Sequence, residues 1–220
     1  MAILDNAAQI LRCFSAEVTE LTVTDVVQRL DMPKANASRL MKAMREAGLL
    51  ETIGASKRHR PGRLLLDIAA SFRASSLLIR RAGELVSRIS RDSGHTGYVS
   101  VRDGREITAV LDFPGTNELR VVSSIGRRLH AHASATGRTL LARLDDDRVR
   151  ALYPEGLPQA SPLSPRSVDA LLARLAEVRR DGFAYSAQES TPGVDSIAVA
   201  VGDPTTDELV SLCIVFPATV

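Results

Sequence analysis

The chain has 220 residues, 45% of them hydrophobic and 25% charged, which is typical of one or two globular domains and unlike disordered or fibrous proteins. Its formal net charge is +2, and its two cysteines, Cys13 and Cys213, give neither a zinc-ligand spacing nor a disulfide framework. We find no secretory signal and no apolar run near the roughly 18 residues of a membrane span, so we expect a cytoplasmic protein with no membrane partner.

Positive charge is concentrated in one segment. Residues 33–63 hold eight basic and two acidic residues, a net charge of +6, whereas residues 76–220 hold 17 basic and 18 acidic residues. A local positive field is expected where a protein meets phosphate groups, but a charge run is more often only a solvated face. The charge alone leaves both interpretations open.

The N-terminal part has the pattern of a helix-turn-helix. Apolar spacing predicts a helix over Leu4–Phe14. Thr22 and Asp25 form a capping box that opens a second helix, and a third helix runs from Pro33 to Ala47, because proline suits a first turn and a glycine follows Ala47. Two helices separated by a break of three or four residues define a helix-turn-helix.

A β-hairpin and a connecting helix follow. Leu49–Ile53 and Lys57–Arg60 flank the turn Gly54–Ser56, and a hairpin directly after a helix-turn-helix is a wing. Apolar residues at helical spacing predict a helix over Arg63–Ser75, which connects the two halves of the chain.

The helix Pro33–Ala47 has two sides. Its apolar side, with Ala37, Leu40, Met41 and Met44, is expected to pack inward. The residues that remain for contact with DNA are Lys34, Asn36, Ser38, Arg39 and Lys42 on the helix, and Lys57, Arg58 and Arg60 on the wing.

These residue types suit different parts of DNA. The forked side chains of Asn36 and Arg39 can pair with the edges of adenine and guanine, whereas Lys34, Ser38 and Lys42 suit phosphate oxygens. The basic wing can reach a minor groove or the backbone. Taken one at a time, these features are also explained by an ordinary amphipathic helix and a solvated turn. Their order, with a capping box, a proline break, a basic helix and a basic hairpin, favours DNA binding.

The C-terminal half is predicted to be an α+β domain. Its strands and helices segregate instead of alternating strictly, which favours a mainly antiparallel sheet with helices packed on it. The predicted helices are Leu77–Ser90, Ala135–Leu144 and Ser167–Arg180, and the predicted strands are Thr96–Arg102, Glu106–Phe113, Leu119–Val122, Phe183–Ala187, Ile197–Val201 and Leu209–Phe216.

Two segments of this half are candidates for ligand binding. The small residues Ser134–Gly137 open a helix whose free N–H groups could hold an anion; the alternative is an ordinary helix with Ser134 as its N-cap. Ser186–Ser196 is predicted to be a loop between strands, and such loops often have no function beyond turning the chain.

Other candidates for chemistry are weaker. His130 and His132 are predicted to share one strand face, but no third ligand has the usual spacing, so no metal is expected. Neither Ser134 nor Ser196 has the sequence context of a nucleophilic serine, and Cys213 lies in an apolar strand where a thiol is inert. We therefore predict no enzyme activity and no cofactor.

Four motifs resemble the IclR family of bacterial regulators: LTVTDVVQRLDMPKANASRLMKAMREAGLLE at 21–51, HRPGRLLLDIA at 59–69, GRRLHAHASATGRTLLA at 126–142 and RRDGFAYSAQESTPGVDSIAVAV at 179–201. The resemblance covers essentially the whole chain, and the later motifs are the more specific ones. Two positions depart from the family pattern: Asp31 stands where a turn glycine is common, and Pro61 where leucine is usual.

The resemblance implies three parts: a winged helix-turn-helix over residues 1–62, a linker helix over 63–76 and a GAF-like effector-binding domain over 77–220. It implies a palindromic DNA operator, a small carboxylate or aromatic acid as effector, and a homodimer or dimer of dimers. Leu4, Leu11 and the connecting helix are our candidates for the dimer contact. The positions that match the family's effector pocket are Ala135, Thr136, Ser186, Ser196, Cys213 and Val215.

The pocket is expected to be less polar than in some members, because Ser186 replaces a carboxylate and Val215 replaces a small hydroxyl residue.

Two other classes of protein are compatible with the residues. One is a winged-helix module for protein interactions with a sensor domain, whose binding to DNA would depend little on salt. The other is an enzyme with a DNA-binding appendage, which requires a cluster of acid, base or nucleophile that the sequence does not contain.

Overall fold

The computed structural model describes residues 3–15, 17–117 and 128–218. They fall into two compact units, Met1–Ser75 and Ser76–Val220, which we describe separately. The predicted strand Leu119–Val122 lies outside the described residues. None of the described helices is long and apolar enough to cross a membrane.

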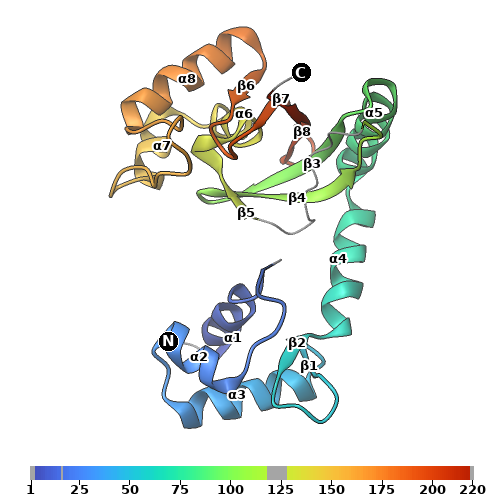
Figure 1. Ribbon diagram of the computed structural model, residues 1–220, viewed down its shortest axis with the longest axis vertical. Helices are drawn as coiled ribbons and strands as arrows, with labels where there is room; N and C mark the ends of the chain where they lie inside the picture. Colours follow the sequence, from blue (N-terminus) through green and yellow to red (C-terminus); the bar gives the residue numbers. More distant parts are fainter. Residues whose placement is uncertain (1–2, 16, 118–127, 219–220) are drawn as a thin grey trace. The chain divides into compact units, whose positions relative to one another are not determined.

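The first unit is a helix-turn-helix followed by a two-stranded hairpin and a helix (Figure 1). The predicted capping box is present: the Thr22 hydroxyl accepts from the Asp25 amide, and the Asp25 carboxylate accepts from the Thr22 amide at 2.7 Å. The elements are α1 (Ile3–Arg12), α2 (Val23–Leu30), α3 (Lys34–Glu46), β1 (Leu50–Thr52), β2 (His59–Pro61) and α4 (Arg63–Ser75).

The turn between α2 and α3 is built on a residue that departs from the family pattern. Asp31 adopts a left-handed conformation with φ 48°, a region that aspartate tolerates better than most residues. Helix α3 then packs on the core through Ala37, Met41 and Met44, each at most 2% exposed, and Leu40 is partly buried there. The predicted inward side of this helix is therefore correct.

The second unit is a six-stranded sheet in the order β5-β4-β3-β8-β7-β6, in which all pairs are antiparallel. This confirms the predicted α+β class. The elements are α5 (Leu77–Ser93), β3 (Thr96–Asp103), β4 (Glu106–Phe113), β5 (Arg128–His130), the 3-10 turn η1 (Ala131–Ala133), α6 (Ala135–Leu141), α7 (Asp146–Leu152), α8 (Val168–Asp181), β6 (Ala184–Ala187), β7 (Val194–Asp203) and β8 (Glu208–Pro217).

The two faces of this sheet carry different helices (Figure 1). Alternate residues of a strand point to opposite faces. In β8, Val210 and Leu212 pack in the cluster that includes α5, whereas Ser211 points to α6, where its hydroxyl is 2.9 Å from that of Thr139. Helices α6 and α8 therefore share the face opposite to α5.

Several boundaries differ from the prediction. Ser186 belongs to β6, in agreement with the predicted strand Phe183–Ala187. Ser196, by contrast, belongs to β7 and pairs with Ser186, so the predicted loop shrinks to residues 188–193, because the ladder extends through polar residues. Helix α6 ends at Leu141 instead of Leu144, since Asp145 caps a separate helix α7. The strand that was predicted to hold His130 and His132 lies earlier in the chain, as β5 at Arg128–His130, because the chain turns into η1 at Ala131.

Candidate functional site

The outer side of α3 carries a row of polar and basic side chains. The apolar contacts of the opposite side fix the rotation of the helix, so the five predicted DNA-contact residues of α3 all reach solvent. The exposed residues are Lys34, Asn36, Ser38, Arg39 and Lys42.

Asn36 and Arg39, one turn apart on α3, touch each other. An Arg39 guanidinium nitrogen donates to the Asn36 amide oxygen at 2.7 Å. This bond uses one donor of the guanidinium and leaves the other donors of the fork to solvent. The two forked side chains that were assigned to base edges are therefore held side by side.

The wing also carries its predicted cations at the surface. Arg58 lies 3.5 Å from a Glu20 carboxylate oxygen, and Arg60 lies 3.1 Å from Glu51. Exposed ion pairs of this kind contribute about 0–1 kcal/mol, so a phosphate can replace the carboxylate at low cost. Lys57 forms no ion pair within the described part of the chain.

A cleft of about 490 Å³ lies in this unit between the start of α2, α3 and the wing. Three of its lining residues are cations, Lys34, Arg45 and Lys57. His59 also lines it, is 8% exposed, and its Nδ1 has no hydrogen-bond partner among the described residues. Arg45 was not among the predicted DNA-contact residues, although its charge contributed to the basic segment in the sequence.

In the second unit, the predicted effector residues lie on one side of the sheet. Ser186 pairs with Ser196, and Ser196 pairs with Val215 on the next strand. Directly paired residues share a face, which here is the face that α6 covers. The exposed fractions are at most 9% for Ala135, Thr136, Ser186, Cys213 and Val215, while Ser196 is half-buried.

The thiol in this group is unreactive. Burial raises the pKa of Cys213 to about 11, and hydrogen bonds from Thr136 and Ser196 offset only part of this effect. Because the thiolate is the reactive form, Cys213 acts here as a small apolar side chain, in agreement with the sequence prediction.

The start of α6 is a capped helix end. The Ser134 hydroxyl accepts from the Gly137 amide at 3.0 Å, which confirms Ser134 as the N-cap. A Cβ at Gly137 would lie 2.1 Å from the Ala131 carbonyl oxygen, so η1 packs tightly against this turn. All seven residues of α6 are buried.

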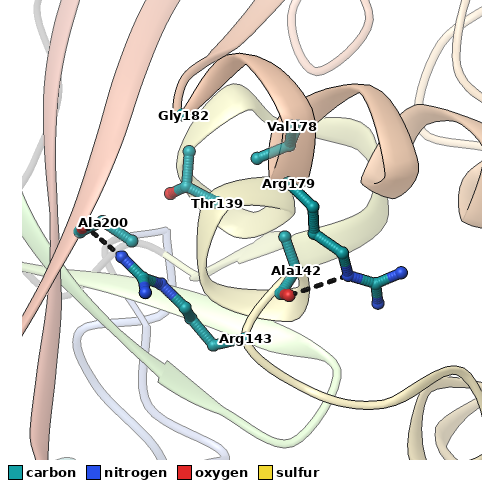
Figure 2. A pocket seen from close by; sticks show the side chains of 7 residues that line it. All are labelled: Thr139, Ala142, Arg143, Val178, Arg179, Gly182 and Ala200. Carbon is teal, nitrogen blue, oxygen red and sulfur yellow. Dashed lines mark hydrogen bonds between the residues drawn. The ribbon is translucent and has the colours of Figure 1, made fainter.

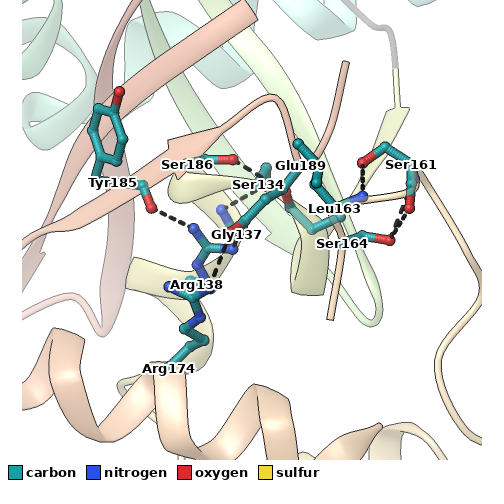
Figure 3. Close-up of polar contacts among 11 residues, drawn as sticks. Ser134, Gly137, Arg138, Ser161, Leu163, Ser164, Arg174, Tyr185, Ser186 and Glu189 are labelled. Atoms are coloured by element: carbon teal, nitrogen blue, oxygen red, sulfur yellow. Dashed lines mark hydrogen bonds and ion pairs between the residues drawn. The ribbon is translucent and has the colours of Figure 1, made fainter. Parts of the chain in front are cut away.

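An ion pair that sequence reasoning missed lies beside this turn. Arg138 is 1% exposed and Glu189 is 5% exposed, and an Arg138 guanidinium nitrogen donates to a Glu189 carboxylate oxygen (Figure 3). The same guanidinium donates to the Tyr185 carbonyl oxygen at 2.6 Å. An arginine in a buried helix with no other charged residue was the available signal, but its partner lies 51 positions away.

A groove of about 340 Å³ lies further along α6, lined in part by Arg143 and Arg179 (Figure 2). Arg143 donates to the Ala200 carbonyl oxygen at 2.9 Å, and Arg179 donates to those of Ala142 and Leu144. Helix C-termini carry partial negative charge, and here the arginines satisfy carbonyl groups near the end of α6. We interpret this groove as structural.

The predicted histidine pair is not on one strand. His130 ends β5, whereas His132 lies in η1 and is fully buried, with Nε2 2.9 Å from the Pro158 carbonyl oxygen. Burial lowers the pKa of His132 to about 4. No group of three potential metal ligands occurs in the described ranges. The two imidazoles lie near each other because the chain turns directly after β5.

An exposed basic helix, a basic wing and a separate α+β unit define a winged-helix DNA-binding regulator. Two family models match: the IclR helix-turn-helix domain over residues 3–54, and the bacterial transcriptional regulator IclR C-terminal domain over residues 73–220. The chain belongs to the IclR family.

Individual relatives agree with this assignment. The chain is 31% identical over 201 residues to the Escherichia coli HTH-type transcriptional regulator XynR, covering 90% of this chain and 79% of XynR. It is 28% identical over 220 residues to E. coli KdgR, covering 97% and 83%. These relatives are transcriptional regulators, so this protein is a regulator that binds DNA and not an enzyme.

Solved structures also match. An IclR-type regulator from Silicibacter sp. TM1040 aligns with a TM-score of 0.90 at 26% identity, covering 99% of this chain and 86% of that one. An IclR homologue from Microbacterium hydrocarbonoxydans, complexed with 4-hydroxybenzoate, aligns with a TM-score of 0.81 at 23% identity, covering 100% and 90%.

Proposed function

We propose that this regulator binds its operator as a symmetric dimer and that a small organic acid, bound in the second unit, controls the affinity for the operator. The observation that carries the proposal is the division into two compact units, one with an exposed basic helix and wing, the other with a buried group of small and hydroxyl-bearing residues. Such a division separates DNA reading from ligand sensing.

In the first unit, we assign base reading to Asn36 and Arg39, and phosphate contacts to Ser38 and to the other exposed cations of α3 and the wing. Three cations, Lys34, Arg45 and Lys57, line one cleft of this unit, and converging positive charge favours an anion. A backbone phosphate fits this arrangement. We add Arg45 to the phosphate contacts on this basis. The full set is Lys34, Ser38, Lys42, Arg45, Lys57, Arg58 and Arg60.

In the second unit, we assign the effector to the α6-facing side of the sheet, among Ala135, Thr136, Ser186, Ser196, Cys213 and Val215. Their hydroxyl groups can orient a polar ligand, while the alanine, valine and thiol contacts bury its carbon skeleton at about 25 cal/mol per Å². The complex of the M. hydrocarbonoxydans homologue with 4-hydroxybenzoate supports an aromatic acid as the first class to test.

Dimerisation is proposed from uncovered apolar surface. Helix α4 has no buried residue, and Leu66, Ile68 and Phe72 on it are 66%, 53% and 53% exposed. Leu4 on α1 is 78% exposed, whereas Leu11 packs partly into the core of its own unit and is a weaker candidate. We infer that α4 and the start of α1 contact a second copy of the chain.

A second uncovered surface supports a dimer of dimers. On the sheet face that carries α5, the strand residues Ile197, Val199 and Val201 are 41%, 39% and 41% exposed. Contiguous exposed apolar residues of this kind are typical of protein contacts. This surface belongs to the second unit, so it can join dimers that are formed by the first.

The effector proposal is tested by thermal unfolding against paired aromatic and aliphatic carboxylates and their neutral amides, beginning with 4-hydroxybenzoate. A true effector at 100 times its Kd stabilises the protein by about 2.7 kcal/mol. Ala135→Leu fills the buried position on α6 and is expected to abolish this shift without changing operator affinity. Ala187→Leu, an exposed position on β6, is the matched control. An undiminished shift in Ala135→Leu would place the effector elsewhere.

A further inference from the structure

One buried carboxylate of the second unit, that of Glu189, lies between two arginines. Glu189 connects two arginines: one carboxylate oxygen accepts from Arg138, and the other lies 3.6 Å from Arg174 on α8. Arg138 is 1% exposed, whereas the Arg174 side chain is 50% exposed. Glu189 therefore lies between a cation inside the unit and a cation at its rim.

Glu189 comes from the connection between β6 and β7 and not from a regular element. It is the one buried residue of residues 188–193, all of which are described. The connection has its own hydrogen bonds, from the Gln188 amide to Val194 and from the Gly193 amide to the Gln188 side chain. The carboxylate is thus carried by a short hairpin whose own bonds do not depend on Arg138.

Arg138 adjoins the proposed effector residues. It follows Ala135 and Thr136 on α6, and its guanidinium holds the carbonyl of Tyr185, the residue before Ser186 (Figure 3). The Ser186 hydroxyl in turn points to the Ala133 carbonyl at 3.4 Å. The guanidinium is therefore located where the start of α6 meets β6.

We propose, building on the effector function proposed above, that Arg138 binds the carboxylate of the effector and that Glu189 is an internal carboxylate which the effector displaces. A planar guanidinium is suited to a carboxylate. Exchange of one carboxylate for another keeps the buried Arg138 guanidinium paired, so the desolvation cost of this guanidinium does not change. Arg174 offers the displaced Glu189 a solvent-exposed partner. A neutral ligand leaves Arg138 unpaired and is rejected.

The test is chemical rescue of Glu189→Ala in the full chain, with acetate as the probe. The variant leaves a buried arginine unpaired, so in sodium chloride the unfolding midpoint of the second unit is expected to fall by about 10 °C. Sodium acetate at the same ionic strength is expected to restore at least half of the loss in a saturable manner. Acetamide with sodium chloride is expected to restore none.

Two controls identify the partner of the acetate. Arg138→Met in the Glu189→Ala background removes the cation that donates to the acetate and is expected to abolish rescue, whereas Arg174→Gln in the same background is expected to retain it. Wild-type protein is expected to need at least about tenfold more acetate for any shift, because Glu189 competes intramolecularly. If Glu189→Ala unfolds in chloride, the yield of refolding in acetate against chloride gives the same comparison.

Equal midpoints in acetate and in acetamide would overturn the proposal, as would rescue that persists in the Arg138→Met background. The result is independent of operator control. If a carboxylate alters operator binding of the wild-type protein while acetate fails to rescue Glu189→Ala, only the assignment to Arg138 fails. If acetate rescues the variant but no ligand in the panel affects operator binding, the effector function fails.

Discussion

Gly62, between the wing and α4, is the glycine of the first unit at which an added methyl group clashes most closely with its neighbours. A Cβ at Gly62 would lie 2.1 Å from the Gly48 carbonyl oxygen and 2.9 Å from the Leu49 carbonyl carbon. Since real Cβ contacts are almost never shorter than 3.0 Å, backbone must move by about 0.9 Å (3.0 − 2.1). The Gly62 amide also donates to the Leu49 carbonyl at 2.9 Å, so movement strains this bond.

Gly62→Ala is expected to cost about 3 kcal/mol, the upper part of the range for overpacking, because the clashing atoms are backbone. Gly54→Ala at the wing tip is the matched control: with φ +54° and no atom within 4 Å, it is expected to cost about 1–2 kcal/mol of conformational strain. Calorimetry measures both, and the transition of the second unit is expected to stay unchanged. A Gly62→Ala loss no larger than that of Gly54→Ala would refute the steric reasoning.

Three further predictions concern base reading, assembly and pH. Asn36→Ala and Arg39→Ala are each expected to cost about 1–3 kcal/mol of binding free energy on the specific site and much less on random DNA. Lys42→Ala, by contrast, is expected to lower both affinities alike. Fluorescence anisotropy distinguishes these outcomes, and equal losses on both DNAs for Asn36→Ala or Arg39→Ala would contradict base reading. Phe72→Glu on α4 is expected to shift the protein toward monomer in light scattering, and an unchanged mass would exclude this contact. The pKa of His132 lies near 4, below its ordinary 6.5. The free energy of unfolding that neutral His132 contributes is therefore fully present above pH 6.5 and is lost as the pH falls toward 4, by about 3 kcal/mol. His132→Asn is expected to flatten this pH dependence in urea unfolding, and an unaltered profile would assign the pH dependence to other groups.

The features that the sequence predicted well depend on local chemistry. The capping box at Thr22, the N-cap at Ser134 and the apolar side of α3 each involve residues at most one or two helical turns apart. Their physical cause is therefore visible in a short window. The antiparallel class also followed from the segregation of strands and helices.

The features that escaped prediction depend on contacts distant in sequence. Ser196 has the composition of a loop, yet it lies in β7 and pairs with Ser186, because the sheet supplies its partner. The pairing of Arg138 with Glu189 has no local pattern. The effector residues themselves followed from the family resemblance. Four of them lie on one sheet face and the other two on α6, and their role stays a prediction.

The most direct test of operator reading by a symmetric dimer is selection of duplex DNA from a random pool by the full-length protein, followed by anisotropy of the enriched duplex. We predict an inverted repeat whose half-sites are separated by about one helical turn, or ~34 Å, or a multiple of it. We also predict an affinity that falls steeply with salt, as expected for several phosphate contacts. A pool without enrichment, or an enriched duplex bound no more tightly than random DNA, would contradict operator reading by this winged helix.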